Sequence, residues 1–128
     1  MNIIRGNRYK DEKISGGPEV CENSMVLLLY KLALSENDLC SGKLLESTYS
    51  PDIPISVKVN EANLLKGIYK GILGMRGGGS VRHIIIPPEE GFGEKGYGNV
   101  PPNATLYAEI CIVAVEPSGE DYGNTENF

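Results

Sequence analysis

Apolar residues along the chain fall into short runs separated by turn-forming residues, which predicts a fold built mainly of β-strands. The run from Met25 to Leu34 is nearly continuous and of strand length, so it is expected to be buried on both faces. The closing segment, Thr105 to Val115, alternates with a period of two, which predicts one face in the core. Further candidate strands lie at 43–47, 55–59 and 81–86, and Pro87 and Pro88 end the last of these.

One helix is predicted between these strands. Asn63 is a candidate N-cap, and apolar residues recur after it at helical spacing: Leu64, Leu65, Ile68, Ile72 and Leu73. Gly67 and Gly71 each cost roughly 1 kcal/mol of helix propensity relative to alanine, so we expect a close approach to the sheet; the alternative is a weak, fraying helix. Several strands and a single helix predict an α+β fold in which an antiparallel sheet covers one helix.

The length of 128 residues fits one domain. We expect its body at residues 24–116. Residues 1–23 are interpreted as an N-terminal arm that adds a short edge strand through Asn2, Ile3 and Ile4. Residues 117–128 contain neither lysine nor arginine and show no apolar periodicity, which predicts a flexible acidic tail.

Composition narrows the class of partner. The chain is 41% hydrophobic and 23% charged, which is typical of a globular protein. Its formal net charge of −5 repels a phosphate backbone, so nucleic acid is not expected as a partner. No apolar run approaches the roughly 20 residues of a membrane span, and the N-terminus lacks a signal-like stretch. We therefore expect a soluble, cytoplasmic monomer without a membrane partner, although a removed targeting segment would leave no trace.

The three cysteines, Cys21, Cys40 and Cys111, are odd in number and lack the C-x-x-C spacing of metal and redox sites. They are interpreted as buried or incidental thiols. A bridge between Cys21 and Cys40 stays open and would require an oxidising compartment.

The sequence contains residues that resemble active-site motifs, but their neighbouring residues do not fit the corresponding sites. The segment from Gly91 to Gly96 matches G-x-G-x-x-G, but a dinucleotide site needs a strand directly before it and a helix opening from it, and prolines on both sides prevent both. His83 is the single histidine and is interpreted as a surface strand residue. No serine or cysteine is accompanied by a credible base. The sequence therefore implies neither a cofactor nor a metal.

The order of six segments resembles the FKBP family of peptidyl-prolyl isomerases. These segments are LLLYKLAL, GKLLEST, PISVKV, NLLKGIYKGILGM, GGGSVRHIIIPPEEGFG and VPPNATLYAEI. Together they cover roughly Ser24 to Glu116, and their combination in this order is highly specific although each segment alone is weak. The resemblance implies a half-open antiparallel β-sheet wrapped around one short α-helix, with a shallow apolar pocket that takes a proline-containing peptide or protein client.

The resemblance also implies site residues. Those matching the catalytic positions are Tyr30, Glu46, Leu65 and Phe92. In the family, the backbone N–H at the position of Leu65 and a tyrosine hydroxyl at the position of Phe92 hold substrate carbonyls, and an acidic residue at the position of Glu46 adds polarity. The positions that would bind substrate are Leu45, Ile55, Val57, Leu64, Ile68, Tyr97, Val100 and Ala108.

The chain departs from the family pattern mainly by losing aromatic residues. Ile68 stands where the family has a floor tryptophan, Phe92 replaces a loop tyrosine, and Glu46 replaces a shorter aspartate. The pocket phenylalanines are replaced by Leu45, Ile55, Val57 and Ala108. Aromatic rings give large, stiff contact surfaces, so we expect prolyl isomerisation at a reduced rate and poor binding of macrolide ligands. The alternative is a non-catalytic interaction or chaperone module that keeps the fold.

Overall fold

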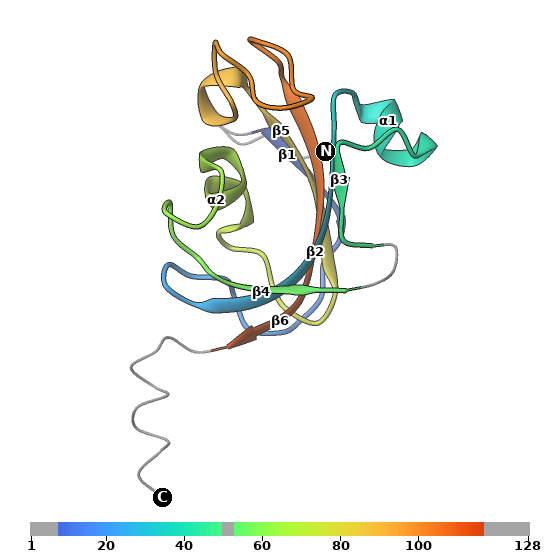
Figure 1. Ribbon diagram of the computed structural model, residues 1–128. Coiled ribbons are helices and arrows are strands. Elements are labelled where there is room, and N and C mark those ends of the chain that lie inside the picture. Colours follow the sequence, from blue (N-terminus) through green and yellow to red (C-terminus); the bar gives the residue numbers. More distant parts are fainter. Residues whose placement is uncertain (1–7, 50–52, 117–128) are drawn as a thin grey trace, which may run out of the picture.

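The computed structural model describes residues 8–49 and 53–116 and contains a strongly curved sheet that wraps around one short helix (Figure 1). Its antiparallel strands are β1 (Arg8–Lys13), β2 (Met25–Ala33), β3 (Glu46–Ser47), β4 (Ile55–Lys58), β5 (Ser80–Ile86) and β6 (Leu106–Glu116). They follow the order β1-β5-β6-β2-β3, and β4 also pairs with β2. The helices are α1 (Glu36–Ser41), α2 (Lys66–Ile72) and the 3-10 helix η1 (Pro88–Glu90). The predicted fold class is confirmed.

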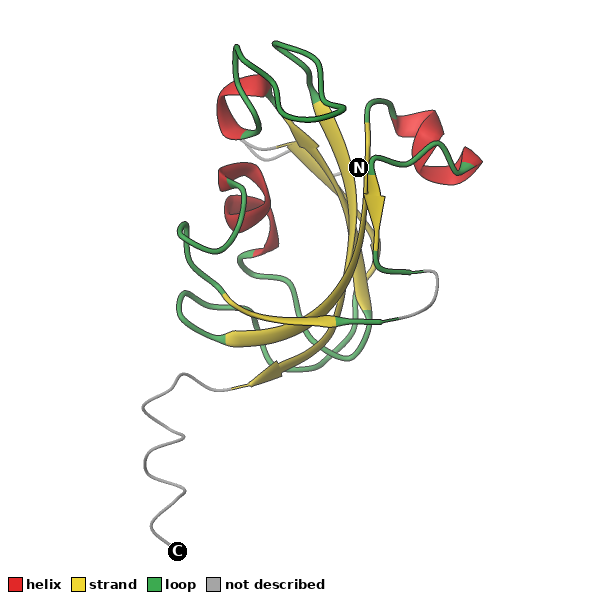
Figure 2. Cartoon of the chain, viewed as in Figure 1, coloured by secondary structure: helices red, strands yellow, loops and turns green. Residues whose placement is uncertain are grey.

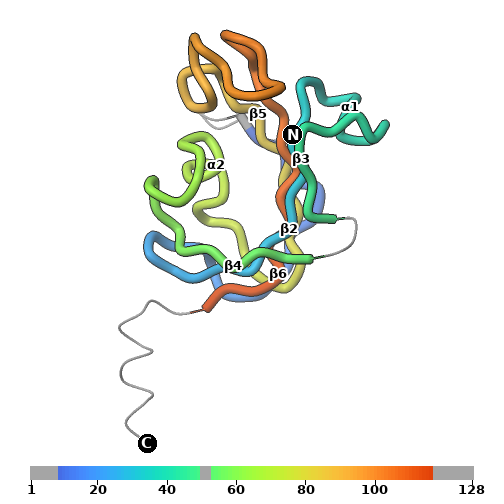
Figure 3. Tube along the Cα trace, in the orientation of Figure 1, coloured from blue at the N-terminus to red at the C-terminus, as the bar shows by residue number. Residues whose placement is uncertain are grey.

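The position of β2 in the sheet explains its apolar sequence. It pairs with β6 along one edge and with both β3 and β4 along the other, so it runs through the centre of the curved sheet (Figure 3). Val26, Leu28 and Leu32 face the core and are buried, whereas Leu27 and Leu29 on the outer face are half-buried. The expectation of burial on both faces is therefore met fully on the inner face and only in part on the outer one.

Helix α2 lies in the hollow of the sheet (Figure 2), and its glycines allow it to sit directly against β5. A Cβ atom placed on Gly67 would lie 2.5 Å from Cγ2 of Ile86, and one on Gly71 would lie 2.5 Å from Cδ1 of Ile84. Real Cβ atoms essentially never approach so closely. The predicted close approach of helix and sheet is thus confirmed, and the packing against β5 offsets the low helix propensity of glycine.

The prediction that Asn63 caps this helix was wrong. The helix begins at Lys66, its N-cap residue is Leu65, and no side chain caps it. The Asn63 side chain instead donates its amide to the Lys58 carbonyl over 3.2 Å. The Asn60 side chain accepts from the backbone N–H of Asn63 over 3.0 Å, which makes a turn before the helix.

A second short helix, α1, was not expected from the sequence. The Ser35 hydroxyl accepts from the Asp38 backbone N–H over 3.2 Å, and Gly42, at a φ of 92°, ends the helix in the left-handed conformation. Leu39 is buried and α1 contacts β2 and β6. Six residues give too little periodicity for a helix to be recognised from its pattern.

The described part of the predicted N-terminal arm belongs to the folded unit. Residues 8–13 form β1 against β5, and Val20 is 1% exposed within the core. The predicted strand through Asn2, Ile3 and Ile4, like the predicted tail at 117–128, lies outside the described residues. Both described α-helices are much too short to cross a membrane.

The three cysteines are free thiols in this structure. Cys21 and Cys40 are exposed, and Cys111 on β6 is half-buried. Burial raises the pKa of the Cys111 thiol, which disfavours its reaction as a thiolate.

A buried arginine holds the edge strand β1 in place. Arg82 points to the inner face of β5 and is 6% exposed. Its Nε lies 2.6 Å from Oδ1 of Asp11 on β1, and its guanidinium donates over 2.8 Å to the Gly71 carbonyl near the end of α2. Its guanidinium carbon lies 3.7 Å from the ring centre of Tyr9. One side chain thereby joins two strands and the helix.

On the outer face, His83 lies between two carboxylates. Its Nε2 is 2.9 Å from Oε1 of Glu109, its Nδ1 is 3.5 Å from Oε2 of Glu12, and its side chain is 21% exposed. His83 lies on the outer face of β5, which agrees with its interpretation as a surface strand residue. The sequence did not indicate its contacts with the two carboxylates. The hydrogen bond from His83 is the main cause that lowers the pKa of Glu109, with a hydrogen bond from Tyr49 and the charge of Lys31 acting in the same direction.

This lowered pKa predicts a loss of stability in acid. A carboxyl group with a lower pKa in the folded state stabilises the fold above its unfolded pKa, near 4.5, and loses that contribution as the pH falls through its folded pKa. Glu109→Gln should therefore unfold with a weaker pH dependence below pH ~4.5. Urea unfolding of both chains at several pH values between 7 and 3 measures this. The same decrease of the unfolding free energy with falling pH in both chains would contradict the prediction.

Candidate functional site

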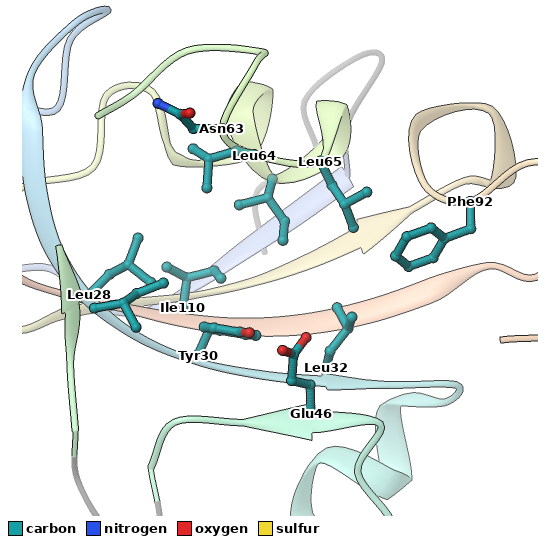
Figure 4. A pocket seen from close by; sticks show the side chains of 11 residues that line it. Leu28, Tyr30, Leu32, Glu46, Asn63, Leu64, Leu65, Phe92 and Ile110 are labelled. Atoms are coloured by element: carbon teal, nitrogen blue, oxygen red, sulfur yellow. The ribbon is translucent and has the colours of Figure 1, made fainter. Parts of the chain in front are cut away.

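A cavity of about 190 Å³ opens between the first turn of α2 and the concave face of the sheet. Figure 4 shows its side chains converging from the helix above, from the sheet below and from the loop after η1. The residues that line it are Leu28, Tyr30, Leu32, Glu46, Ile55, Asn63, Leu64, Leu65, Ile68, Phe92 and Ile110. This volume suits a small ring or a short aliphatic side chain better than a folded surface.

Leu64, Leu65 and Ile68 form the helical wall of the cavity. Leu64 and Leu65 are half-buried just before α2, and Ile68 is 8% exposed one turn into it. Because Leu65 is the N-cap residue, its N–H precedes the intrahelical hydrogen bonds that begin with Tyr69, whose N–H donates to the Leu65 carbonyl over 2.8 Å. The N-terminal end of α2, whose first N–H groups have no partner within the helix, therefore lies at this apolar wall.

The opposite wall carries two polar groups, Tyr30 from β2 and Glu46 from β3. The strands are held in register by the Leu45 N–H, which donates to the Leu32 carbonyl over 2.7 Å, and by the Tyr30 N–H, which donates to Oγ1 of Thr48 over 2.9 Å. This register places the Tyr30 hydroxyl against the Glu46 carboxylate, as Figure 4 shows.

The surroundings of Tyr30 keep its hydroxyl protonated. Burial raises its pKa well above the usual value, and the hydrogen bond to the Glu46 carboxylate raises it further because the charged acceptor disfavours a phenolate. The hydroxyl therefore remains a hydrogen-bond donor throughout the physiological pH range.

A hydrogen-bonded loop after η1 provides the aromatic side of the cavity. The rings of Phe92 and Tyr97 stack with centroids 5.3 Å apart and an interplanar angle of 19°. Tyr97 and Val100 exchange two backbone hydrogen bonds of 3.0 and 2.8 Å, which close the loop. The helix η1, which precedes this loop, is tied to α2 by Lys70, whose Nζ lies 2.9 Å from Oε2 of Glu90.

Seven of the residues implied by the family resemblance line this cavity. They are Tyr30, Glu46, Leu65, Phe92, Ile55, Leu64 and Ile68. Their assigned roles in catalysis or substrate binding stay predictions, but the fold does bring them together from five separate segments of the sequence.

The other five implied residues do not line the cavity: Leu45, Val57, Tyr97, Val100 and Ala108. Leu45 and Val57 pack as half-buried residues against the core, and Val100 is 7% exposed within it. Ala108 is fully buried, and its single methyl group replaces a longer ring in the family pattern. Tyr97 lies behind Phe92, stacked on it, and is 72% exposed.

Four lining residues were missed: Leu28, Leu32, Asn63 and Ile110. Three of them could have been found from strand periodicity, because residues two apart on a strand share a face. Leu28 and Leu32 flank Tyr30 in this way, and Ile110 is two residues beyond Ala108. Asn63 lies outside the strands, so strand periodicity does not identify it, and the sequence indicated only a role as a helix cap.

The chemistry that this arrangement permits is non-covalent. The described lining residues include no serine, cysteine or histidine, and their polar groups are one hydroxyl, one carboxylate and one amide. Such a cavity can remove an amide from water, hold a ring against an apolar floor and direct a few hydrogen bonds.

Comparison with known proteins agrees with this geometry. The family model for FKBP-type peptidyl-prolyl cis-trans isomerase matches residues 17–113. Chloroplastic FKBP16-4 of Arabidopsis thaliana is 33% identical over 123 residues, covering 91% of this chain and 51% of the relative. FK506-binding protein 2A of Rhizopus delemar is 35% identical over 112 residues, covering 83% and 64%. The chain thus spans about half to two thirds of the length of these relatives.

Solved structures show the same fold. FkpA from Escherichia coli superposes with a TM-score of 0.74 at 25% identity, covering 88% of this chain and 49% of that one. AtFKBP13 gives a TM-score of 0.72 at 25% identity, covering 85% of this chain and 92% of that one. Because the family model spans most of the sequence and the cavity lies within the matched residues, the chain belongs to the FKBP-type peptidyl-prolyl cis-trans isomerase family.

Proposed function

We propose that this chain catalyses cis/trans isomerisation of peptide bonds before proline in protein segments, at a reduced rate. The observation that carries the proposal is the apolar cavity with Ile68 in its lining and a Tyr30–Glu46 pair on the facing wall. Its volume of about 190 Å³ accommodates a proline ring.

The reaction needs no nucleophile. Rotation about an amide has a barrier of ~18–20 kcal/mol because resonance is lost in the twisted form. In the twisted form the nitrogen becomes pyramidal and its lone pair no longer delocalises onto the carbonyl, so the amide is less polar than in the planar forms. An apolar site that excludes water from the amide therefore favours the twisted form. Each ~1.4 kcal/mol by which the cavity binds the twisted form better than the planar forms gives about a tenfold increase in rate.

The aliphatic lining accounts for the reduced rate. Ile68 offers a smaller and less rigid surface than an aromatic floor, and Phe92 lacks a hydroxyl that could donate to a substrate carbonyl. One hydrogen bond contributes about 0.5–1.5 kcal/mol net, which corresponds to a factor of roughly 2 to 13. The same losses are expected to weaken the binding of macrolide ligands.

Restoring the aromatic groups should raise the activity. We expect Phe92→Tyr to increase kcat/KM for a short Leu-Pro peptide by about 2- to 10-fold, through one added hydrogen bond. Ile68→Trp should lower KM by about fivefold, since a larger ring would fill part of the open cavity. NMR exchange spectroscopy of the peptide measures both, and Leu27→Val on the outer face of β2 serves as a matched control away from the cavity.

The same NMR exchange measurement with the native chain tests the main proposal. Acceleration of exchange well above the uncatalysed rate supports an isomerase. No acceleration by the native chain, together with a gain in either variant, would favour a second function: a protein-interaction or chaperone module that binds proline segments without turnover. The aliphatic floor at Ile68 is the observation that favours this second candidate.

A further inference from the structure

We infer that the preferred clients carry a basic residue next to the proline, and that Glu46 selects them. This inference rests on the proposed function, because it concerns the client segment that would occupy the same cavity. It names the chemical class of that segment, which the apolar lining alone leaves open.

Glu46 is the one charged residue among the described residues that line the cavity. Its carboxylate accepts a hydrogen bond from the Tyr30 hydroxyl, a neutral donor that leaves the negative charge in place. None of the lysine, arginine or histidine side chains in the described part of the chain lies within 4.0 Å of it. The residue is also exposed, so a client side chain can reach it.

Two of the cations on the elements that frame the cavity are paired elsewhere, whereas Lys66 of α2 and Lys58 of β4 have no carboxylate of the described residues within 4.0 Å. Lys70 of α2 contacts Glu90 at 2.9 Å, and Lys31 of β2, next to Tyr30 but on the opposite face of the sheet, contacts Glu109 at 3.8 Å. Arg82 of β5 is bound by Asp11 at 2.6 Å. The Glu46 carboxylate itself takes part in no ion pair among the described residues, and it lies at the solvent-exposed edge of the apolar lining.

An exposed aromatic ring lies next to the side of the cavity that Phe92 provides. Phe92 lines the cavity, and Tyr97 stacks on Phe92 while 72% of it stays exposed. The face of a tyrosine ring attracts lysine and arginine side chains. With Glu46 on one wall and Tyr97 beyond the other, the mouth favours a cation and disfavours an anion. The net charge of −5 acts in the same direction at longer range.

The test is binding and turnover of matched peptides. One series varies the residue before proline in Ala-Xaa-Pro-Phe, and a second varies the residue after it in Ala-Leu-Pro-Xaa, with lysine, leucine or glutamate as Xaa. We expect at least one series to show a Kd about tenfold lower for lysine than for glutamate, measured by NMR titration, with a parallel ratio in kcat/KM. About 1 M NaCl should reduce the ratio to near one.

Glu46→Gln should abolish most of this preference, because it removes the charge and keeps the shape. Glu94→Gln is the matched control: it removes one exposed carboxylate on the loop outside the cavity lining and should leave the ratio unchanged. A lysine-to-glutamate ratio below threefold in both series, or one that survives Glu46→Gln, overturns the inference. Turnover of the leucine peptides tests the isomerase proposal separately.

Discussion

Arg82→Met should destabilise the protein by about 3–5 kcal/mol, because it leaves a buried partner without its opposite charge. The Asp11 side chain is only 13% exposed, and it would lose the contact of 2.6 Å to Arg82. The Gly71 carbonyl would lose its donor, and Tyr9 the cation that covers its ring at 3.7 Å. Chemical unfolding with urea measures the loss.

The damage should concentrate on the edge strand β1. This strand pairs with β5 alone, and Arg82 links it through Asp11 to the carbonyl of Gly71 in α2. We therefore expect amide hydrogen exchange at residues 9–13 to be faster in the variant than in the parent chain. The increase in exchange rate should be smaller in β2 and β6.

Two further variants separate the buried pair from general damage. The double variant Asp11→Leu with Arg82→Met removes both charges together and should recover much of the stability, since no unpaired charge remains. Lys10→Met breaks the exposed contact between Lys10 and Glu12, 3.1 Å apart, and should have little effect. A single variant Arg82→Met as stable as Lys10→Met would show that the buried network is not a stabilising element.

Gly67→Ala is expected to destabilise the protein by about 1–3 kcal/mol, although alanine favours helices. The helix gain of about 1 kcal/mol is offset because the added Cβ would lie 2.5 Å from Cγ2 of Ile86, 3.0 Å from its Cγ1 and 3.2 Å from its Cβ. The Cβ of Ile86 is the branch point of its side chain, so these atoms cannot rotate away as the end of a flexible side chain could. Either α2 or β5 has to shift.

That shift should also be visible in binding. Gly67 lies next to Ile68, so displacing the helix moves the floor of the cavity relative to the Tyr30 wall. We expect a Leu-Pro peptide to bind the variant several-fold more weakly in the same NMR titration. Unchanged stability and affinity in Gly67→Ala would argue against the close packing of helix and sheet.

Matched variants keep this prediction specific. Gly16→Ala places a Cβ with no other atom within 4 Å and should be neutral or slightly stabilising. Ile86→Ala alone should cost about 2–5 kcal/mol through its cavity. Combining it with Gly67→Ala should cost less than the sum of the two, because the smaller side chain removes the clash that the new methyl group creates.

Much of the fold was predictable from local pattern. The long apolar run became the central strand, the alternating segment became β6, and the helix formed where apolar residues recur at its period. Gly67 and Gly71 even indicated the approach of that helix to the sheet. These features are legible because they depend on residues a few positions apart, whose spacing follows directly from the geometry of strands and helices.

The pocket was only partly accessible in this way. The resemblance supplied seven of its lining residues, but it also assigned five that pack in the core or lie on the rim. Substitutions explain some of this: the methyl group of Ala108 does not extend into the space that a phenylalanine ring would occupy. Leu28, Leu32 and Ile110 could be reached only by extending the strand faces that the resemblance had already identified.

The sequence by itself determined the family, the strands β2 to β6 and helix α2, and the apolar character of the cavity, but not the strand β1 at residues 8–13. Tertiary structure alone decided that Tyr30 donates to Glu46, that Arg82 turns inward to Asp11 and Gly71, and that Asn63 leaves the helix uncapped to form a turn. These contacts join residues up to 71 positions apart. They depend on strand register and on the curvature of the sheet, which no local pattern specifies.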